Sequence, residues 1–293
     1  MTYDSLTALR PDLILLSLSA YGASGPWRDV PGIGGTIEPT SGMSALNGYG
    51  DGPPMNSGAM LPDAIAGYYG LAALMTALHQ RDRTGEGQYI DLSMSDMLTH
   101  LMPEAVFDYA VNARQPMLQG NRDRLHAPQG VYRCRGWDAW VGISITTERE
   151  WRALCDVLGQ PELAEDPQFA TAEERQARHD ELDALITRWT RRNRREEAVR
   201  LLQEAGVAAG ASFNTKDLLN DRHLKARGFV WAVDHPETGR RRMLGVPWRI
   251  SGMAPVRVRR APLLGEHTEE VLQGLLGLDP QEVQRLADEQ VAY

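Results

Sequence analysis

The pattern of apolar residues near the start of the chain predicts a buried β-strand. Residues 11–20 contain an apolar run with little alternation, as expected for a strand covered on both faces in a parallel sheet. Glycine and proline within 21–26 then end the strand. Because open α/β sheets bind ligands beyond the C-terminal ends of their strands, the loop that begins at Tyr21 and Gly22 is a candidate binding edge.

A long segment without periodicity, residues 29–58, precedes the clearest helical pattern. The segment is rich in glycine, proline, serine and asparagine, and structureless loops of this length are often functional. Helical spacing of apolar residues then begins at Pro62 and Asp63 and continues to Leu78, before Gly85 ends the helix.

Further elements follow from the same patterns. Residues 88–94 predict a second strand, and Ser95 with Asp96 is a candidate cap for a helix that runs towards Val111. A β-hairpin is expected at 130–145, followed by helices at 148–158, 172–189 and 195–205. The chain then returns to strands from Phe229 and ends with helices from Leu264 and at 280–287. The basic run at 190–195 fits a solvated helix end better than a phosphate site.

These elements divide the chain into three parts and indicate an α/β fold. We expect a large α/β domain over residues 1–125 and a small α+β domain over 126–230. Residues 231–293 would then return to the large domain, so that the small domain is an insertion within the sequence of the large one.

Composition and charge narrow the classes of function. The net charge of −8 argues against nucleic acid or an anionic membrane as a partner. The apolar run at 13–18 is too short to cross a membrane, and it follows Asp12 rather than a basic segment, so neither a membrane span nor a signal peptide is expected. Cys134 and Cys155 lack metal-type and redox spacing, which favours a reducing, cytoplasmic setting.

Common catalytic motifs are missing from the sequence. It contains no P-loop, no G-x-G-x-x-G after a strand, no G-x-S-x-G and no H-E-x-x-H. Four histidines lie singly and far apart, so no metal site is predicted; they are His126, His223, His235 and His267.

Asp63 is the carboxylate that its position singles out. The helix dipole and the free N–H groups of the first turn favour its ionised form. An ionised carboxylate can attack an activated acyl group and form a covalent intermediate. A plain helix N-cap explains the same position, and position alone favours that second interpretation.

The segments around Asp63 carry a resemblance to a known family. They include Gly52-Pro-Pro, Ser57-Gly-Ala-Met-Leu-Pro-Asp63, Thr84-Gly-Glu-Gly87-Gln-Tyr-Ile-Asp91, Ser19-Ala-Tyr-Gly22 and the ending Pro262-Leu-Leu-Gly-Glu-His-Thr-Glu-Glu-Val-Leu272. Together they resemble the family III CoA-transferases, the CaiB/BaiF group that contains formyl-CoA and carnitine CoA-transferases. The resemblance runs in the right order over nearly the whole chain.

This resemblance implies a fold, a reaction and a set of partners. It implies an interlocked homodimer, with a Rossmann-like large domain built from both chain ends and a small domain between them. Asp63 takes the place of the family's nucleophile, and Tyr21 and Gly22 become candidates for CoA binding. The substrates would be an acyl-CoA and a carboxylic acid, with no tightly bound cofactor and no metal.

Departures from the family pattern modify these expectations. The chain begins well inside the family's large domain, so the first strand–helix units are expected to lie outside it, with a separate chain as one source. The stretch 31–34 lacks the lysine, tyrosine and glutamate of formyl-CoA members, which argues against oxalate or formate. Asn121 and Arg122 stand where those members have a glycine run. Apolar residues hint at a larger acyl group, although core packing explains them nearly as well; they are Trp27, Ile33, Met43, Tyr49 and Met55.

Two alternatives stay open from the sequence. An α-methylacyl-CoA racemase shares this fold and aspartate but uses a histidine that precedes the aspartate as its second acid/base group. No histidine lies between Met1 and Asp63, since the first is His79, which argues against racemisation. The other alternative is an inactive, truncated homologue that only binds CoA.

Overall fold

The computed structural model describes residues 2–115, 117–254, 256 and 258–292. It has two compact units, Met1–Ala211 and Ser212–Tyr293. The strands are β1 Ile14–Ser19, β2 Gln88–Ser93, β3 Gln129–Arg133, β4 Trp140–Ser144 and β5 Ala208–Ala211 in the first unit, and β6 Val230–His235 and β7 Gly239–Leu244 in the second. The expected domain bounds at residues 125 and 230 stay a prediction.

The first unit contains most of the helices. They are α1 Tyr3–Thr7, α2 Gly34–Thr40, α3 Leu61–Thr84, α4 Met94–His100, α5 Pro103–Asn112, α6 Glu148–Leu158, α7 Ala172–Ala177, α8 His179–Thr190 and α9 Arg195–Glu204, with short 3₁₀ turns at Met43–Leu46, Pro161–Ala164 and Pro167–Phe169. The second unit contains α10 Thr215–Asn220, α11 Arg222–Ala226, a π-helical turn at Glu270–Leu275 and α12 Pro280–Asp288.

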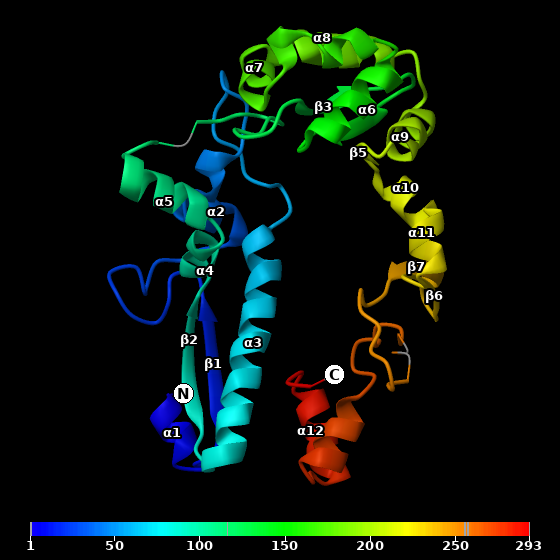
Figure 1. Ribbon diagram of the computed structural model, residues 1–293. Helices are drawn as coiled ribbons and strands as arrows, with labels where there is room; N and C mark the ends of the chain where they lie inside the picture. The colour runs from blue at the N-terminus through cyan, green and yellow to red at the C-terminus, as the bar shows by residue number, and fades with distance from the viewer. Residues whose placement is uncertain (1, 116, 255, 257, 293) are drawn as a thin grey trace. The chain divides into compact units, whose positions relative to one another are not determined.

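Strands β1 and β2 form a parallel pair with α3 along one face (Figure 1), which confirms the predicted α/β class. The helix approaches closely because Gly70 has no side chain: a β-carbon there would lie 3.1 Å from Leu16 Cδ2. The expectation that β1 is covered on both faces is wrong within the described residues. Leu18 remains 41% exposed and every other residue of the strand is only half-buried.

Two elements before and after α3 differ from the predictions. The segment 29–58 contains α2 and a 3₁₀ turn rather than being structureless throughout. The helix expected to run towards Val111 is two helices, because Pro103 lacks the N–H that a continuous helix needs and instead begins α5. The cap of α4 is Ser93 rather than Ser95, since the Ser93 hydroxyl accepts from the Asp96 N–H at 3.2 Å.

The main apolar core of the first unit lies between an antiparallel sheet and three helices. Strands β3, β4 and β5 form this sheet, which confirms the predicted hairpin at 130–145. Its core is built from buried residues of the sheet and of α6, α8 and α9, with Trp151 among the largest. The helix predicted at 172–189 is α7 followed by α8, because Arg178 leaves helical geometry at φ −113°, ψ 25°.

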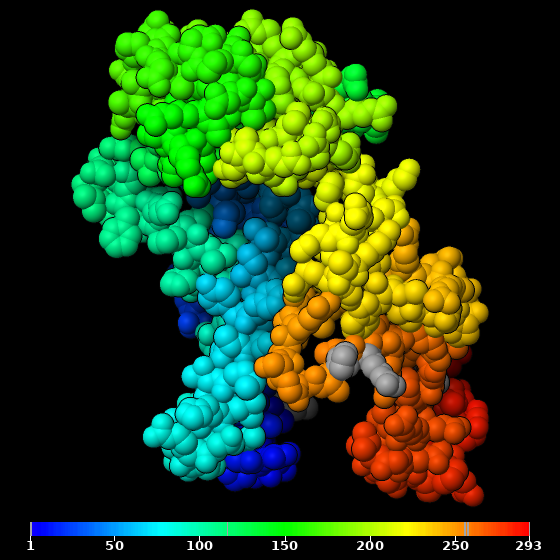
Figure 2. Space-filling model, turned by 45° about the vertical axis from the view of Figure 1, so that its right-hand side comes forward, coloured from blue at the N-terminus to red at the C-terminus, as the bar shows by residue number. Residues whose placement is uncertain are grey.

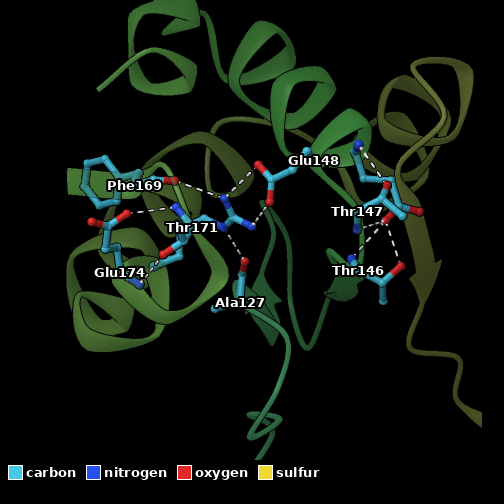
Figure 3. A network of polar contacts seen from close by, with 9 residues as sticks. Ala127, Thr146, Thr147, Glu148, Phe169, Thr171 and Glu174 are labelled. Carbon is cyan, nitrogen blue, oxygen red and sulfur yellow. Dashed lines mark hydrogen bonds and ion pairs between the residues drawn. The ribbon is translucent and has the colours of Figure 1, made fainter. Parts of the chain in front are cut away.

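A buried arginine joins several elements of this region (Figure 3). Arg175 is 2% exposed, and its Nε donates to the Ala127 carbonyl at 2.9 Å. Nη1 donates to the Phe169 carbonyl at 3.0 Å, and Nη1 and Nη2 donate to the two Glu148 carboxylate oxygens at 3.1 and 2.7 Å. The guanidinium carbon lies 5.2 Å from the ring centroid of Trp151. Only the planar fork of arginine satisfies all of these acceptors at once.

Replacing Arg175 by lysine is therefore expected to destabilise the fold strongly. A single ammonium leaves buried carbonyls unpaired, so we expect a loss of about 3 kcal/mol in the free energy of unfolding. Urea unfolding measures it. Arg178→Lys is the control, since its ion pair with Glu181 is exposed and should be worth less than about 1 kcal/mol. Equal urea midpoints for the two variants would contradict this account.

The second unit confirms the predicted return to strands. Strands β6 and β7 form an antiparallel hairpin in which His235 pairs with Gly239. The helix expected from Leu264 begins later, as the π-helical turn at Glu270–Leu275. Helix α12 begins as predicted at Pro280, where the Asp279 carboxylate accepts two backbone N–H groups at 2.9 Å.

An apolar face of α3 is exposed to solvent. Tyr68, Leu71 and Met75 follow helical spacing and are 63%, 55% and 58% exposed, and the helix, cyan in Figure 2, lies at the surface. This face begins one turn after Asp63. Across the described part of the chain, no helix combines the length and the apolar character needed to span a membrane.

Candidate active site around Asp63

Asp63 lies in the first turn of α3, as its third residue. The N-cap is Met60, so the interpretation of Asp63 as a plain N-cap is wrong. Met60 has φ 47° and ψ 47°, a left-handed conformation that costs a non-glycine residue about 1 kcal/mol. Its carbonyl accepts the Asp63 N–H at 3.2 Å. Strain of this kind persists only where surrounding contacts impose it, and here it sits directly before the candidate nucleophile.

The Asp63 side chain lies against the first residue of α2. A β-carbon added at Gly34 would lie 2.2 Å from Asp63 Oδ2 and 3.0 Å from Met60 Sδ, so only glycine fits there without displacing the carboxylate. Within the described residues, no hydrogen bond or ion pair engages the Asp63 side chain, and the residue is exposed. An unpaired, exposed carboxylate in the first turn of a long helix lies at the positive end of the helix dipole and is accessible to a substrate.

Two residues of the preceding segment, Asn56 and Ser57, fasten it to α2. Glu38 is 1% exposed, and its two carboxylate oxygens accept from Ser57, from the backbone N–H at 2.6 Å and from the hydroxyl at 2.7 Å. Asn56 Nδ2 donates to the Gly35 carbonyl at 2.8 Å, and Asn56 Oδ1 accepts from the Ser44 hydroxyl at 2.6 Å. The backbone just before Met60 and Asp63 is therefore tied to the helix on which Gly34 lies.

The candidate CoA-binding residues lie on the loop after β1. Gly22 has φ +86°, which a glycine adopts without strain, and the next N–H, of Ala23, donates to both oxygens of Asp91 at 2.9 and 3.0 Å. The Tyr21 hydroxyl lies 3.3 Å from Thr40 Oγ1 on α2. The loop is thus held both by β2 and by α2.

The short segment before α2 connects the two sets of predicted residues. A β-carbon at Gly32 would lie 3.2 Å from the ring of Tyr21, while one at Gly34 would meet Asp63. Tyr21 and Asp63 therefore contact the same three-residue segment. The structure brings both sequence-predicted residues to the chain that leads into α2, while the Tyr21 hydroxyl reaches Thr40 at the far end of that helix.

Asn121 and Arg122 lie elsewhere in the first unit, beside a cavity of about 730 Å³. The Asn121 amide donates to the Tyr49 hydroxyl at 3.2 Å, and Arg122 forms ion pairs with Asp180 and Asp183. Burial by itself would raise the pKa of Asp183, but donors from neighbouring side chains, Arg122 among them, outweigh it and hold that pKa below the ordinary value. Arg122 is consequently already neutralised by two carboxylates.

The thiols are unsuited to nucleophilic chemistry. Cys134 and Cys155 are both free and buried. Burial raises the pKa of both, to about 12 for Cys155, so neither is a thiolate near neutral pH. Among the residues that the structure describes, no group of three or more histidine, cysteine, aspartate or glutamate side chains is placed to hold a metal ion.

Sequence reasoning missed three contributors to this site: Glu38, Met60 and the contact made by Gly34. Glu38 follows a run of small and apolar residues, Gly34 to Ile37. Gly34 was noted only as a departure from the formyl-CoA members. A charged residue inside an otherwise apolar or glycine-rich stretch is the one available signal, because such a residue is seldom buried without a partner.

Comparisons with known proteins place the chain in a family. The model of CoA-transferase family III matches residues 1–268. A succinyl-CoA–D-citramalate CoA-transferase of Chloroflexus aurantiacus is 32% identical, over 99% of this chain and 72% of the relative. A formyl-CoA:oxalate CoA-transferase of Rhodopseudomonas palustris is 29% identical, over 98% of this chain and 72% of the relative.

Solved structures agree with this assignment. A crystal structure of a CaiB/BaiF family protein from Brucella suis superposes with a TM-score of 0.82 at 29% identity, covering 94% of this chain and 71% of the other. The family match spans both sides of the site around Asp63. The chain therefore belongs to CoA-transferase family III.

Proposed function

We propose that this CoA-transferase moves CoA from an acyl-CoA to a carboxylic acid through a covalent intermediate on Asp63. Family membership supports CoA transfer. The observation that carries the role of Asp63 is its exposed carboxylate, unpaired among the described residues, which rests against Gly34 in the first turn of α3. The position leaves the carboxylate unpaired and accessible to a substrate, which a nucleophile requires.

The chemistry runs in four balanced steps. Asp63 Oδ attacks the donor thioester, the C–S bond breaks, and a mixed anhydride and CoA thiolate form. The thiolate attacks the aspartyl carbonyl, which releases the donor acid and leaves an aspartyl-CoA thioester. The acceptor carboxylate then attacks the carbonyl of this thioester, which expels the thiolate and forms a second mixed anhydride, between Asp63 and the acceptor. Finally the thiolate attacks the acceptor carbonyl, which gives the new acyl-CoA and restores the Asp63 carboxylate.

The test is a panel of acyl-CoA donors and carboxylic acid acceptors, with the formation of each new acyl-CoA measured by chromatography. Transfer with any pair supports the proposal. Exchange of a donor α-proton with solvent, without transfer, would instead identify a racemase. The absence of both reactions across the panel, with CoA binding retained, would favour an inactive homologue.

The surroundings of Asp63 favour an acceptor larger than formate. Ile33 is 62% exposed and directly precedes Gly34, and Met60, 53% exposed, places its sulfur next to the same glycine. Exposed apolar side chains beside the nucleophile offer contact to the carbon skeleton of a substrate. We therefore propose an acceptor or donor acid with an apolar portion, in place of oxalate or formate.

The homodimer and the cytoplasmic location stay proposals. The exposed apolar face of α3 supports burial against another protein surface. Sedimentation at several concentrations measures the mass of the assembly, and a monomer at all of them would contradict the dimer.

The tether between Asp91 and Ala23 gives a prediction for acyl-CoA binding. Asp91→Ala removes the carboxylate that accepts the Ala23 N–H and so loosens the loop that carries Tyr21 and Gly22. We expect KM for acyl-CoA to rise about fivefold, equivalent to about 1 kcal/mol, with little change in kcat. Asp91→Asn keeps an oxygen acceptor and should behave like the wild type. A fall in kcat at unchanged KM would contradict this role for the loop.

A further inference from the structure

We infer that Glu38 is a positioning residue for the nucleophile and acts by anchoring Ser57. This inference rests on the proposed role of Asp63. Glu38 lies on α2, and its carboxylate holds both the backbone N–H and the hydroxyl of Ser57, at 2.6 and 2.7 Å. Its side chain is 1% exposed, and its hydrogen bonds go to Ser57 rather than to Asp63.

Burial of a carboxylate costs free energy unless hydrogen bonds satisfy its oxygens, as Ser57 does here. These two bonds fix the chain six residues before Asp63. Asn56, the adjacent residue, adds a second attachment through the Gly35 carbonyl at 2.8 Å. The segment from Ser57 to Met60 is thereby fastened at its start to α2 and enters α3 at its end.

This fastening explains the backbone at Met60. Left-handed geometry at a non-glycine residue needs contacts on both sides to maintain it. Helix α3 supplies one side and the Glu38–Ser57 attachment supplies the other. Because α2 also presents Gly34 to the Asp63 carboxylate, one helix sets both the path of the chain into α3 and the wall against which the carboxylate rests. Releasing Ser57 should therefore move Asp63 relative to Gly34.

Three variants separate positioning from charge. Glu38→Ala removes both acceptors and should lower kcat by about 10- to 100-fold, with KM for acyl-CoA within about threefold of the wild type. Glu38→Gln keeps an oxygen for the Ser57 N–H and an amide that can donate to the Ser57 hydroxyl, so it should restore most of the rate. Ser57→Ala loses one of the two bonds and should fall between them.

The measurements are kcat, KM and the fraction of Asp63 that hydroxylamine traps after incubation with acyl-CoA. Glu150→Ala is the matched control, because Glu150 also accepts from backbone N–H and hydroxyl groups, at Thr146 and Thr147, but on α6. It should lower the melting temperature without changing kcat of the folded protein. Trapping of Asp63 should fall in Glu38→Ala and stay at the wild-type level in Glu150→Ala.

The outcomes distinguish this inference from the proposed function. If Asp63→Ala is inactive while folded Glu38→Ala and Ser57→Ala both keep the wild-type kcat, the positioning role is wrong and the nucleophile stands. If Glu38→Gln is as slow as Glu38→Ala, the charge of Glu38 acts rather than its hydrogen bonds, which also overturns the inference. If Glu38→Ala does not fold, Ser57→Ala and Glu38→Gln decide it alone. Turnover by Asp63→Ala would instead overturn the proposed function.

Discussion

Replacement of Asp63 by alanine is expected to abolish CoA transfer. The methyl group cannot attack a thioester, and no other described carboxylate rests against Gly34 to replace it. Loss of a covalent nucleophile lowers kcat by about four orders of magnitude or more. Steady-state formation of the new acyl-CoA measures it. Asp63→Glu should be nearly as inactive, because its extra methylene drives the carboxylate away from a position bounded by Gly34 and Met60.

The matched control for Asp63 lies at the equivalent position of a neighbouring helix. Asp96 is the third residue of α4, is exposed, and belongs to the first turn, as Asp63 does in α3. Asp96→Ala should therefore cost a similar amount of helix stability, about 0.5 kcal/mol, and leave kcat unchanged. If Asp63→Ala and Asp96→Ala turned over equally fast, Asp63 would not be the nucleophile.

Gly34→Ala should produce the second-largest effect. The added methyl group would lie 2.2 Å from Asp63 Oδ2, far inside contact distance, and the carboxylate is the part that can rotate away. A displacement of about 1 Å from the reactive geometry costs about 100-fold in rate, so we expect kcat to fall by that factor while KM for acyl-CoA changes little. Initial rates at saturating acyl-CoA measure the change in kcat.

Gly67→Ala is the control for Gly34→Ala. Gly67 lies one turn after Asp63 on α3, and a β-carbon there meets nothing within 4 Å. It removes a helix-interior glycine, so it should stabilise α3 by up to about 1 kcal/mol and leave kcat unchanged. Wild-type kcat in folded Gly34→Ala would show that the carboxylate does not work where the structure places it.

The start of α3 was the part of the site most accessible from the sequence. Helical spacing and Pro62 located it, because proline fits the first turn and apolar residues at helical spacing indicate a helix, even though several of them are exposed in α3. The N-cap itself was missed. Met60 has no capping side chain, and its left-handed backbone follows from contacts made by residues far away in the sequence rather than from its own preference.

The residues that position Asp63 could not be identified from the sequence for a related reason. Gly34 and Glu38 precede Asp63 by more than twenty residues, across a segment with no periodicity. Only the folding of α2 against α3 brings them to the nucleophile. Glycine tolerates many surroundings, so its presence does not reveal that a carboxylate oxygen occupies the space where a side chain would be.

Elements with strong local signals were predicted well, and tertiary effects account for the misses. The β3–β4 hairpin follows from strand patterning and α6 from helical periodicity, and in the structure a capping box of Thr147 and Glu150 begins α6. The break between α4 and α5 was signalled by Pro103 but outweighed by apolar periodicity on both sides. The half-exposed state of β1 was not predictable, because the sequence of an apolar strand does not show which of its faces other elements cover.

The most direct test of Asp63 as the nucleophile is mass spectrometry of the trapped enzyme. The protein is incubated with an accepted acyl-CoA, treated with hydroxylamine and digested, and the peptide that contains Asp63 is sequenced by fragmentation. Our account predicts an aspartyl hydroxamate on Asp63 that depends on acyl-CoA and is lost in Asp63→Ala. Efficient turnover with an unmodified Asp63 peptide, or a hydroxamate on a different carboxylate, would contradict it.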